Sequence, residues 1–144
     1  MVILIVGSVE PQLLGTVAHL KAYTPADYKL VAEFVSRFRV VAVTPQVLTE
    51  VAHFVGKIGG RYSAHIRVRF IELVTILRER PVPTRRAVDR KEFAGLDLAD
   101  CTLLEAAGSD DILLSTDAQL VLERLTRGLP AINFNRLREA AGIL

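Results

Sequence analysis

Three acidic side chains, Glu50, Asp100 and Asp117, combine a residue type and a placement that suit a metal-dependent hydrolytic site. They come from distant segments, and each lies in a helix or turn that adjoins an expected apolar strand. Carboxylates that converge at one sheet edge repel one another unless a cation neutralises them. An all-oxygen ligand set favours Mg²⁺ or Mn²⁺ over a softer metal. Such an ion activates water and stabilises the charge that develops on a phosphodiester during cleavage.

Each of these acids also has an ordinary structural explanation. Glu50 borders the apolar stripe of its helix, where a solvated glutamate is common. Asp100 stands three residues after Asp97, a spacing typical of helix capping. Asp117 is positioned to cap the helix that follows it. The residues alone therefore leave two interpretations open, a shared cation site and three independent surface or capping acids.

The elements that would position these acids alternate between short apolar strands and helices. Strands are expected over Val2–Val6, Arg39–Val43, Ile112–Leu114 and Ala131–Phe134. Helices are expected over 24–37, 46–55, 62–80, 98–107 and 116–128, with a last helix capped by Asn135. The first of these begins with a capping box formed by Thr24 and Asp27. The alternation predicts an α/β fold whose parallel sheet is covered on both faces. Folds of this kind bind ligands at the carboxyl ends of their strands. The first apolar run is also compatible with one end of a helix.

Composition restricts the class of protein further. The chain has 144 residues, 51% of them hydrophobic and 24% charged, which predicts one globular domain. The single cysteine, Cys101, excludes an internal disulfide framework and a multi-cysteine zinc site. No apolar stretch is long enough to span a bilayer, and the N-terminus lacks the pattern of a signal peptide. We therefore expect a cytoplasmic protein without a membrane partner.

A basic segment follows the longest expected helix and is a candidate for phosphate binding. Arg85, Arg86 and Arg90 are the residues that we expect to contact an RNA backbone. The net charge of the chain is only +2, and acidic residues are interspersed in this segment. A solvated charged surface is therefore the alternative interpretation. Phosphate-binding glycine loops of the dinucleotide and P-loop types are absent from the sequence.

Four segments together resemble the successive signatures of the PIN-domain family. They read TPQVLTEVAHF from Thr44, GLDLADCTLLEAA from Gly95, ILLSTDAQL from Ile112 and PAINFNRLR from Pro130. The resemblance implies a single domain over 1–144, built as a three-layer α/β/α sandwich with a mostly parallel sheet. It also implies a Mg²⁺- or Mn²⁺-dependent endoribonuclease, a homodimer, and an antitoxin or other protein partner.

Carried over by position, the resemblance assigns roles to individual residues. Glu50, Asp100 and Asp117 would be catalytic and metal-binding acids. Thr116 would be a supporting polar residue, and Asn133 would lie near the site at the end of the last strand.

The sequence departs from the family pattern at its beginning. Members of the family begin with a strand that ends in an aspartate, and no such aspartate is present here. Either the chain is truncated at its N-terminus, or Val2–Val6 serves as the first strand with Ser8 or Glu10 at its tip. Three functions follow: an active endoribonuclease, a catalytically impaired PIN-like module that binds RNA or a protein, and a structural protein whose acids cap helices.

Overall fold

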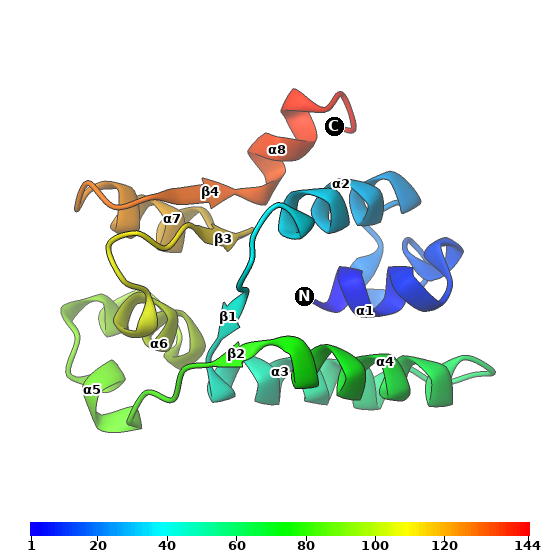
Figure 1. Ribbon diagram of the computed structural model, residues 1–144, viewed down its shortest axis with the longest axis horizontal. Coiled ribbons are helices and arrows are strands. Elements are labelled where there is room, and N and C mark those ends of the chain that lie inside the picture. The colour runs from blue at the N-terminus through cyan, green and yellow to red at the C-terminus, as the bar shows by residue number, and fades with distance from the viewer. The chain divides into compact units, whose positions relative to one another are not determined.

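Helices and short strands alternate along the chain, as the apolar pattern predicts. The computed structural model describes residues 1–144 and contains eight α-helices and four strands, which makes the protein α/β. The strands form two separate two-stranded sheets, β1–β2 and β3–β4, where one continuous sheet was expected. The chain divides into two compact units, which are described separately below (Figure 1). None of the helices combines the length and the apolar character needed to cross a bilayer.

Unit 1 comprises Met1–Ala42 and Leu48–Arg78. Its principal helices are α1 (Val2–Val9), α2 (Pro25–Ser36), α4 (Ser63–Ile76) and most of α3 (Pro45–Lys57). Helix α1 packs against both α2 and α4. Thr24 and Asp27 close the predicted capping box at the start of α2, where one Asp27 oxygen accepts from the Thr24 amide at 2.7 Å and from its hydroxyl at 2.9 Å.

The first apolar run is a helix, so the expected strand over Val2–Val6 is wrong and the alternative interpretation as part of a helix is confirmed. Ile5 and Val6 are buried in the core of unit 1. Gly7 lets α1 approach α2 closely, because a methyl group at this position would lie 2.5 Å from ring carbons of Tyr28. A continuous apolar segment has no periodicity that separates a buried strand from a buried helix. Packing against two other helices decides the outcome here.

Unit 2 comprises Val43–Val47 and Glu79–Leu144. It holds α5 (Thr84–Val88), α6 (Leu98–Ala106), β3 (Leu113–Ser115), α7 (Ala118–Leu125), β4 (Ala131–Asn133) and α8 (Phe134–Ala140). Strands β3 and β4 are parallel, with Ser115 in register with Asn133, and α7 packs on both of them (Figure 1). The apolar core unites α6, β3 and α7 through Cys101, Leu104, Leu113 and Leu120. The β3–α7–β4 unit is the part of the predicted α/β architecture that the structure shows.

The two strands of the other sheet are short. Strand β1 (Ala42–Val43) pairs with β2 (Arg78–Glu79). Within unit 1 the Arg78 amide donates to the Val41 carbonyl at 2.9 Å, and within unit 2 the Arg80 amide donates to the Val43 carbonyl at 2.8 Å. The two donor amides are two residues apart, and so are the two acceptor carbonyls. Both pairs advance in the same chain direction, so the strands are parallel.

Several boundaries differ from the sequence prediction. The long helix expected over 62–80 ends at Ile76, after three consecutive β-branched residues, and Leu77 is extended. The last strand ends at Asn133, and this residue rather than Asn135 caps the final helix, because its Oδ1 accepts from the Asn135 amide at 2.9 Å. Strand β3 lies one residue later than predicted, over Leu113–Ser115.

Candidate functional site

Polar side chains gather at the carboxyl ends of β3 and β4 in unit 2. Ser115 and Asn133 are the last residues of the two strands and are partners in the parallel register. Thr116 follows Ser115 and is exposed. Asp117 comes next and is the N-cap of α7. Thr116 and Asp117 thus lie just beyond the carboxyl end of β3, and Asn133 lies at the carboxyl end of β4, the edge at which parallel sheets bind ligands.

The local geometry of Asp117 is set by two hydrogen bonds. Its Oδ1 accepts from the Leu120 amide at 2.8 Å, and its own amide donates to the Ser115 hydroxyl at 3.0 Å. Leu120 is fully buried, so the first turn of α7 is anchored in the core of unit 2. The capping prediction is thereby confirmed. A capping carboxylate still has its second oxygen, and each oxygen has more than one acceptor site.

Asp100 occupies the first turn of α6, on a helix that shares its core with α7. Its amide donates to Asp97 Oδ1 at 2.8 Å, so Asp97 is the N-cap and Asp100 the third helical residue, as predicted. Asp100 is half-buried. The next residue, Cys101, is fully buried, and this burial raises the pKa of its thiol. Cys101 is therefore a core residue rather than a nucleophile.

Glu50 lies in the other unit. It is exposed on α3, in the part of that helix that belongs to unit 1. Asp100 and Asp117 belong to unit 2. The structure thus brings two of the three predicted acids into one unit, and the convergence of all three stays a prediction. No group of three or more His, Cys, Asp or Glu side chains in the structure is arranged to hold a metal ion.

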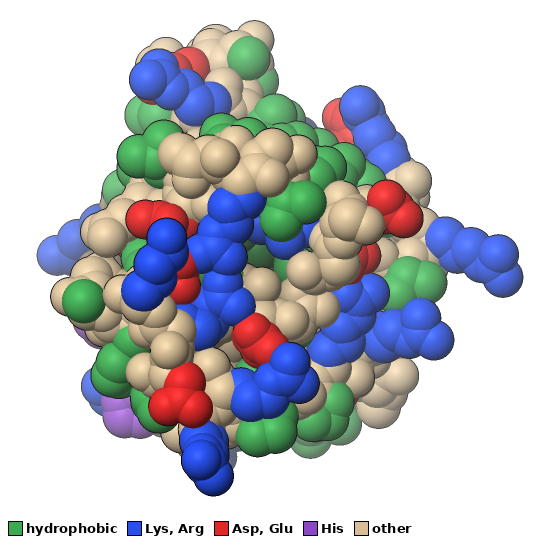
Figure 2. Space-filling view, turned by 90° about the vertical axis from the view of Figure 1, so that its left-hand side faces the viewer, with side chains coloured by type: hydrophobic (Ala, Val, Ile, Leu, Met, Phe, Trp, Pro, Cys, Tyr) green, Lys and Arg blue, Asp and Glu red, His purple; other side chains and the backbone are tan.

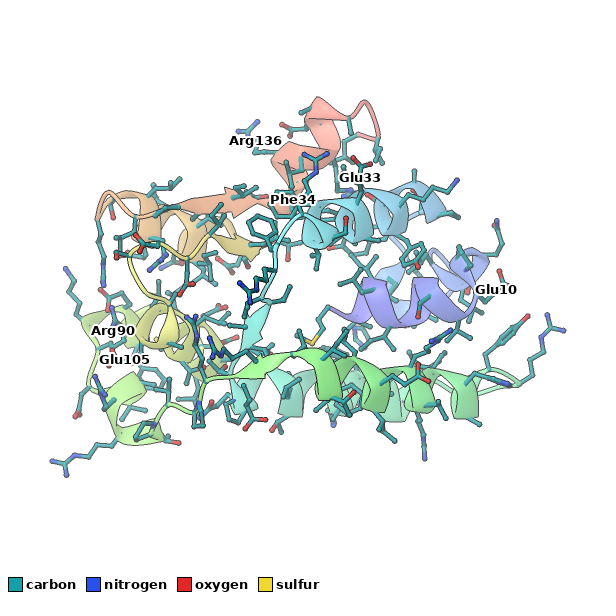
Figure 3. All side chains as sticks on the ribbon, in the orientation of Figure 1. Glu10, Glu33, Phe34, Arg90, Glu105 and Arg136 are labelled. Carbon is teal, nitrogen blue, oxygen red and sulfur yellow. The ribbon has the colours of Figure 1, made fainter.

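The three candidate RNA-binding arginines differ in how they are held. The Arg85 side chain is 91% exposed, with its Nε 3.9 Å from Asp89. Arg86 is mostly exposed and pairs with Glu105. Arg90 is largely buried and points toward Glu105, to which its Nη1 donates at 2.7 Å (Figure 3). Basic and acidic side chains are intermixed on the face shown in Figure 2. Arg85 is therefore the most accessible of the three for a phosphate contact, and RNA binding by the set stays a prediction.

Glu92 extends this ion-pair cluster into the core of unit 2. It is buried and pairs with Arg127 and with Arg90, whose Nε lies 3.2 Å from Glu92 Oε2. Its burial does not fit the alternative interpretation of this segment as a solvated charged surface. The cluster instead ties the segment after α5 to the end of α7, because each buried carboxylate requires a cationic partner.

A buried guanidinium that sequence analysis did not identify supports the loops of unit 2. Arg124 on α7 is 1% exposed. Its nitrogens donate to the carbonyls of Ala107 at 3.2 Å, Asp111 at 2.9 Å and Pro130 at 3.3 Å, and to that of Gly108. Desolvation lowers the pKa of Arg124. The loop before β3 and the loop before β4 are thus joined by one side chain.

Asp111 lies in the first of these loops and is held by a second arginine. It forms an ion pair with Arg80, with an additional Nη2–Oδ1 distance of 3.3 Å. Its Oδ2 also accepts from the Gly108 amide at 2.7 Å. The hydrogen bond from Arg80 is the main cause that lowers the pKa of Asp111, and it raises the pKa of Arg80. These contacts fix the amino end of β3, opposite the end that carries Asp117.

The two candidates for a replacement of the missing first aspartate are both engaged locally in unit 1. The Ser8 hydroxyl donates to the Ile5 carbonyl at 2.8 Å, within α1. Glu10 Oε1 accepts from the Gln12 amide at 3.2 Å, and Oε2 lies 3.4 Å from the Tyr62 hydroxyl. Glu10 therefore caps the turn after α1 (Figure 3). Neither residue stands at the tip of a strand, as that interpretation required.

Comparison of the chain with protein-family models, curated proteins and solved structures gave no match.

Proposed function

We propose that the protein is a metal-dependent endoribonuclease of the PIN type. The observation that supports this most is the placement of Asp117 just after β3 and of Asn133 at the end of β4, at the carboxyl ends of two paired parallel strands. Asp100 lies on a helix that packs in the same core. The proposal includes the finer fold, a three-layer α/β/α sandwich with a mostly parallel sheet, and assembly as a homodimer in the cytoplasm.

The donor chemistry fits a hard divalent cation. Asp100 and Asp117 would hold Mg²⁺ or Mn²⁺ through carboxylate oxygens, with Glu50 as the third acid in this proposal. When bound, such an ion supplies an activated water and stabilises charge on the phosphate. Other residues of the chain would hold the metal-binding side chains in position. Ser115 fixes the backbone of Asp117, and Asn133 borders the same edge. Arg85 is the side chain that would contact an RNA phosphate outside the site.

The test is cleavage of single-stranded RNA in the presence of Mn²⁺ by wild type and by Asp117→Asn. Asparagine is as good an N-cap as aspartate, so this substitution removes the charge and keeps the start of α7. Asp110→Asn is the matched control, since Asp110 is an exposed acid before the amino end of β3. We expect at least a tenfold loss of cleavage for Asp117→Asn and none for the control. Equal activity of wild type and Asp117→Asn would contradict the proposal.

A second candidate is a catalytically impaired PIN-like module that binds RNA or a protein partner such as an antitoxin. The observation that favours it is the first apolar segment, which is helix α1 and ends without an aspartate. Under this alternative the chain would retain RNA in a filter-binding assay and would not cleave it with Mg²⁺ or Mn²⁺. An Arg85→Ala variant would then bind RNA more weakly and with a shallower salt dependence.

A further inference from the structure

One segment of unit 1 carries a positive charge that the net charge of the chain conceals. Residues 51–71 include no acidic side chain, whereas they include two histidines and four cations, Lys57, Arg61, Arg67 and Arg69. The rest of the chain has more acidic than basic side chains. A local excess of this kind is typical of a surface that attracts a polyanion.

Three side chains of this segment form a row along α4. Arg61, His65 and Arg69 are spaced four residues apart, which places them on one side of the helix. Arg61 lies one residue before the N-cap, Tyr62. All three side chains of the row are exposed, and Lys57, the last residue of α3, is exposed as well. We refer to Arg61, His65 and Arg69 as the α4 basic row.

The two arginines of the row keep donors for a ligand. The guanidinium of Arg61 is held by a ring rather than by a carboxylate, since it lies 4.7 Å from the centroid of the Tyr62 ring. Arg69 pairs with Glu72 at 2.7 Å, and both of these side chains are about half exposed. An exposed ion pair contributes roughly 0–1 kcal/mol, and a guanidinium has five N–H donors. Arg69 can therefore also bind a phosphate.

An open cavity lies beside the row, between α4 and the end of α1, which pack against each other (Figure 1). Its volume of about 440 Å³ is within the range of pockets that hold small ligands. Val9, Ala64 and Val68 give it apolar walls, and His65 and Arg69 of the row also line it. This combination suits a nucleobase, because a base has apolar faces and stacks on imidazole and guanidinium groups.

Cations beside a stacking surface favour a nucleic-acid strand over an anionic membrane. Proteins that bind single strands combine a positively charged track for the phosphates with planar side chains for the bases. A phospholipid surface offers phosphates and no planar group for the Arg61 guanidinium or the cavity. A duplex keeps its bases stacked on one another, so it cannot place one in the cavity.

We propose that unit 1 binds single-stranded RNA along the α4 basic row. Lys57, Arg61 and Arg69 contact successive phosphates, and one unpaired base occupies the cavity beside His65. This site is distinct from the candidate arginines of residues 85–90, which belong to unit 2. The choice of RNA among polyanions rests on the proposed function, whereas the binding surface does not require the metal site.

Fluorescence anisotropy of a labelled oligouridylate, recorded in EDTA, measures this binding without cleavage. Arg61→Ala/Arg69→Ala is expected to bind about tenfold more weakly than wild type. Its salt slope should fall by roughly 1.4, because each phosphate contact on a single strand contributes roughly 0.7. Lys29→Ala/Arg37→Ala is the matched control, since it removes the same charge from exposed positions of unit 1 and should bind like wild type.

Three results of this titration would overturn the proposal. They are no binding by wild type, no loss in Arg61→Ala/Arg69→Ala, and an equal loss in Lys29→Ala/Arg37→Ala. Circular dichroism of each variant confirms that it is folded.

A gain of affinity tests the row independently of any loss of folding. Glu72→Gln removes the carboxylate that competes with phosphate for Arg69, so it should bind oligouridylate about threefold more tightly. Glu33→Gln is the matched control, because Glu33 is also an exposed acid of unit 1 that pairs with an arginine. Its affinity should equal that of wild type. An affinity of Glu72→Gln no higher than that of Glu33→Gln would contradict the proposal.

Inorganic polyphosphate separates the base from the phosphates, because it supplies charge without a base. Arg61→Ala/Arg69→Ala should bind both polymers more weakly, whereas His65→Ala should bind oligouridylate about threefold more weakly and polyphosphate as wild type does. Unchanged oligouridylate binding by His65→Ala would refute the place of the base. Sedimentation with phosphatidylglycerol vesicles tests the membrane alternative, and binding to vesicles without binding to oligouridylate would overturn the proposal.

Cleavage with Mn²⁺ distinguishes a failure of this site from a failure of the proposed function. A protein that cleaves RNA, and whose RNA affinity is unchanged in Arg61→Ala/Arg69→Ala, would refute the binding surface alone. A protein that does not cleave RNA, and whose RNA affinity falls in that variant, would refute the ribonuclease activity alone.

Discussion

Replacement of Arg124 by methionine tests whether one buried guanidinium supports the loops that lead into β3 and β4. The side chain is 1% exposed and donates to four backbone carbonyls in two loops. Methionine keeps the length and the apolar stem of the side chain and leaves those carbonyls without their donor. A hydrogen bond to a charged group contributes roughly 1.5–3 kcal/mol. The arginine also loses its own hydration on burial, which offsets part of this sum.

The expected net loss is about 3–5 kcal/mol, because each buried carbonyl left without a donor costs about 1–3 kcal/mol and the relieved burial of the charge offsets part of the total. For a chain of this size such a loss lowers Tm by about 10 °C. The assay is urea and thermal unfolding followed by circular dichroism. Arg136→Met is the matched control, because the Arg136 side chain is 80% exposed and pairs with an exposed glutamate, so we expect a change below about 0.5 kcal/mol. A loss below about 1 kcal/mol for Arg124→Met would refute the reasoning.

Two further predictions concern α1 and the loop before β3. Gly7→Ala should destabilise the protein by about 1–2 kcal/mol in urea unfolding, because overpacking against Tyr28 outweighs the gain in helix propensity; an increase in stability would contradict the close approach. Arg80 lowers the pKa of Asp111, so the carboxylate stabilises the fold above the unfolded-state pKa of about 3.9, and this contribution is lost as pH falls through the lowered folded-state pKa. Asp111→Asn should therefore be less stable than wild type at pH 7, and the difference in unfolding free energy between the two proteins should narrow in acid. A difference independent of pH would be inconsistent with this ion pair.

Features fixed by neighbouring residues could be predicted from the sequence. The Thr24–Asp27 capping box and the helix caps at Asp97 and Asp117 are confirmed, because each depends on a side chain and an amide two or three residues away. The placement of Asp117 just after β3 and of Asn133 at the end of β4 follows from the same local pattern together with the rule for parallel sheets.

Features fixed by distant contacts could not be predicted. The run after Met1 is apolar throughout, so its helical state depends on packing against α2 and α4 rather than on periodicity. In the sequence nothing distinguishes Arg124 from other helix arginines. The carbonyls that surround it come from 13 to 17 residues earlier and from a later loop, so no local pattern indicates its burial. Arg90 lies in a segment whose sequence indicates either phosphate binding or a solvated charged surface, and only the packing of α5, α6 and α7 shows that it pairs with Glu92 inside unit 2.

Binding of Mn²⁺, measured by the loss of the free-ion signal in electron paramagnetic resonance, tests the central claim most directly. The proposal that Asp117 belongs to a hard-cation site predicts saturable binding by wild type. It also predicts at least tenfold weaker binding by Asp117→Asn and unchanged binding by Asp110→Asn. Absence of binding by the folded wild type, or equal affinity of all three proteins, would contradict the claim.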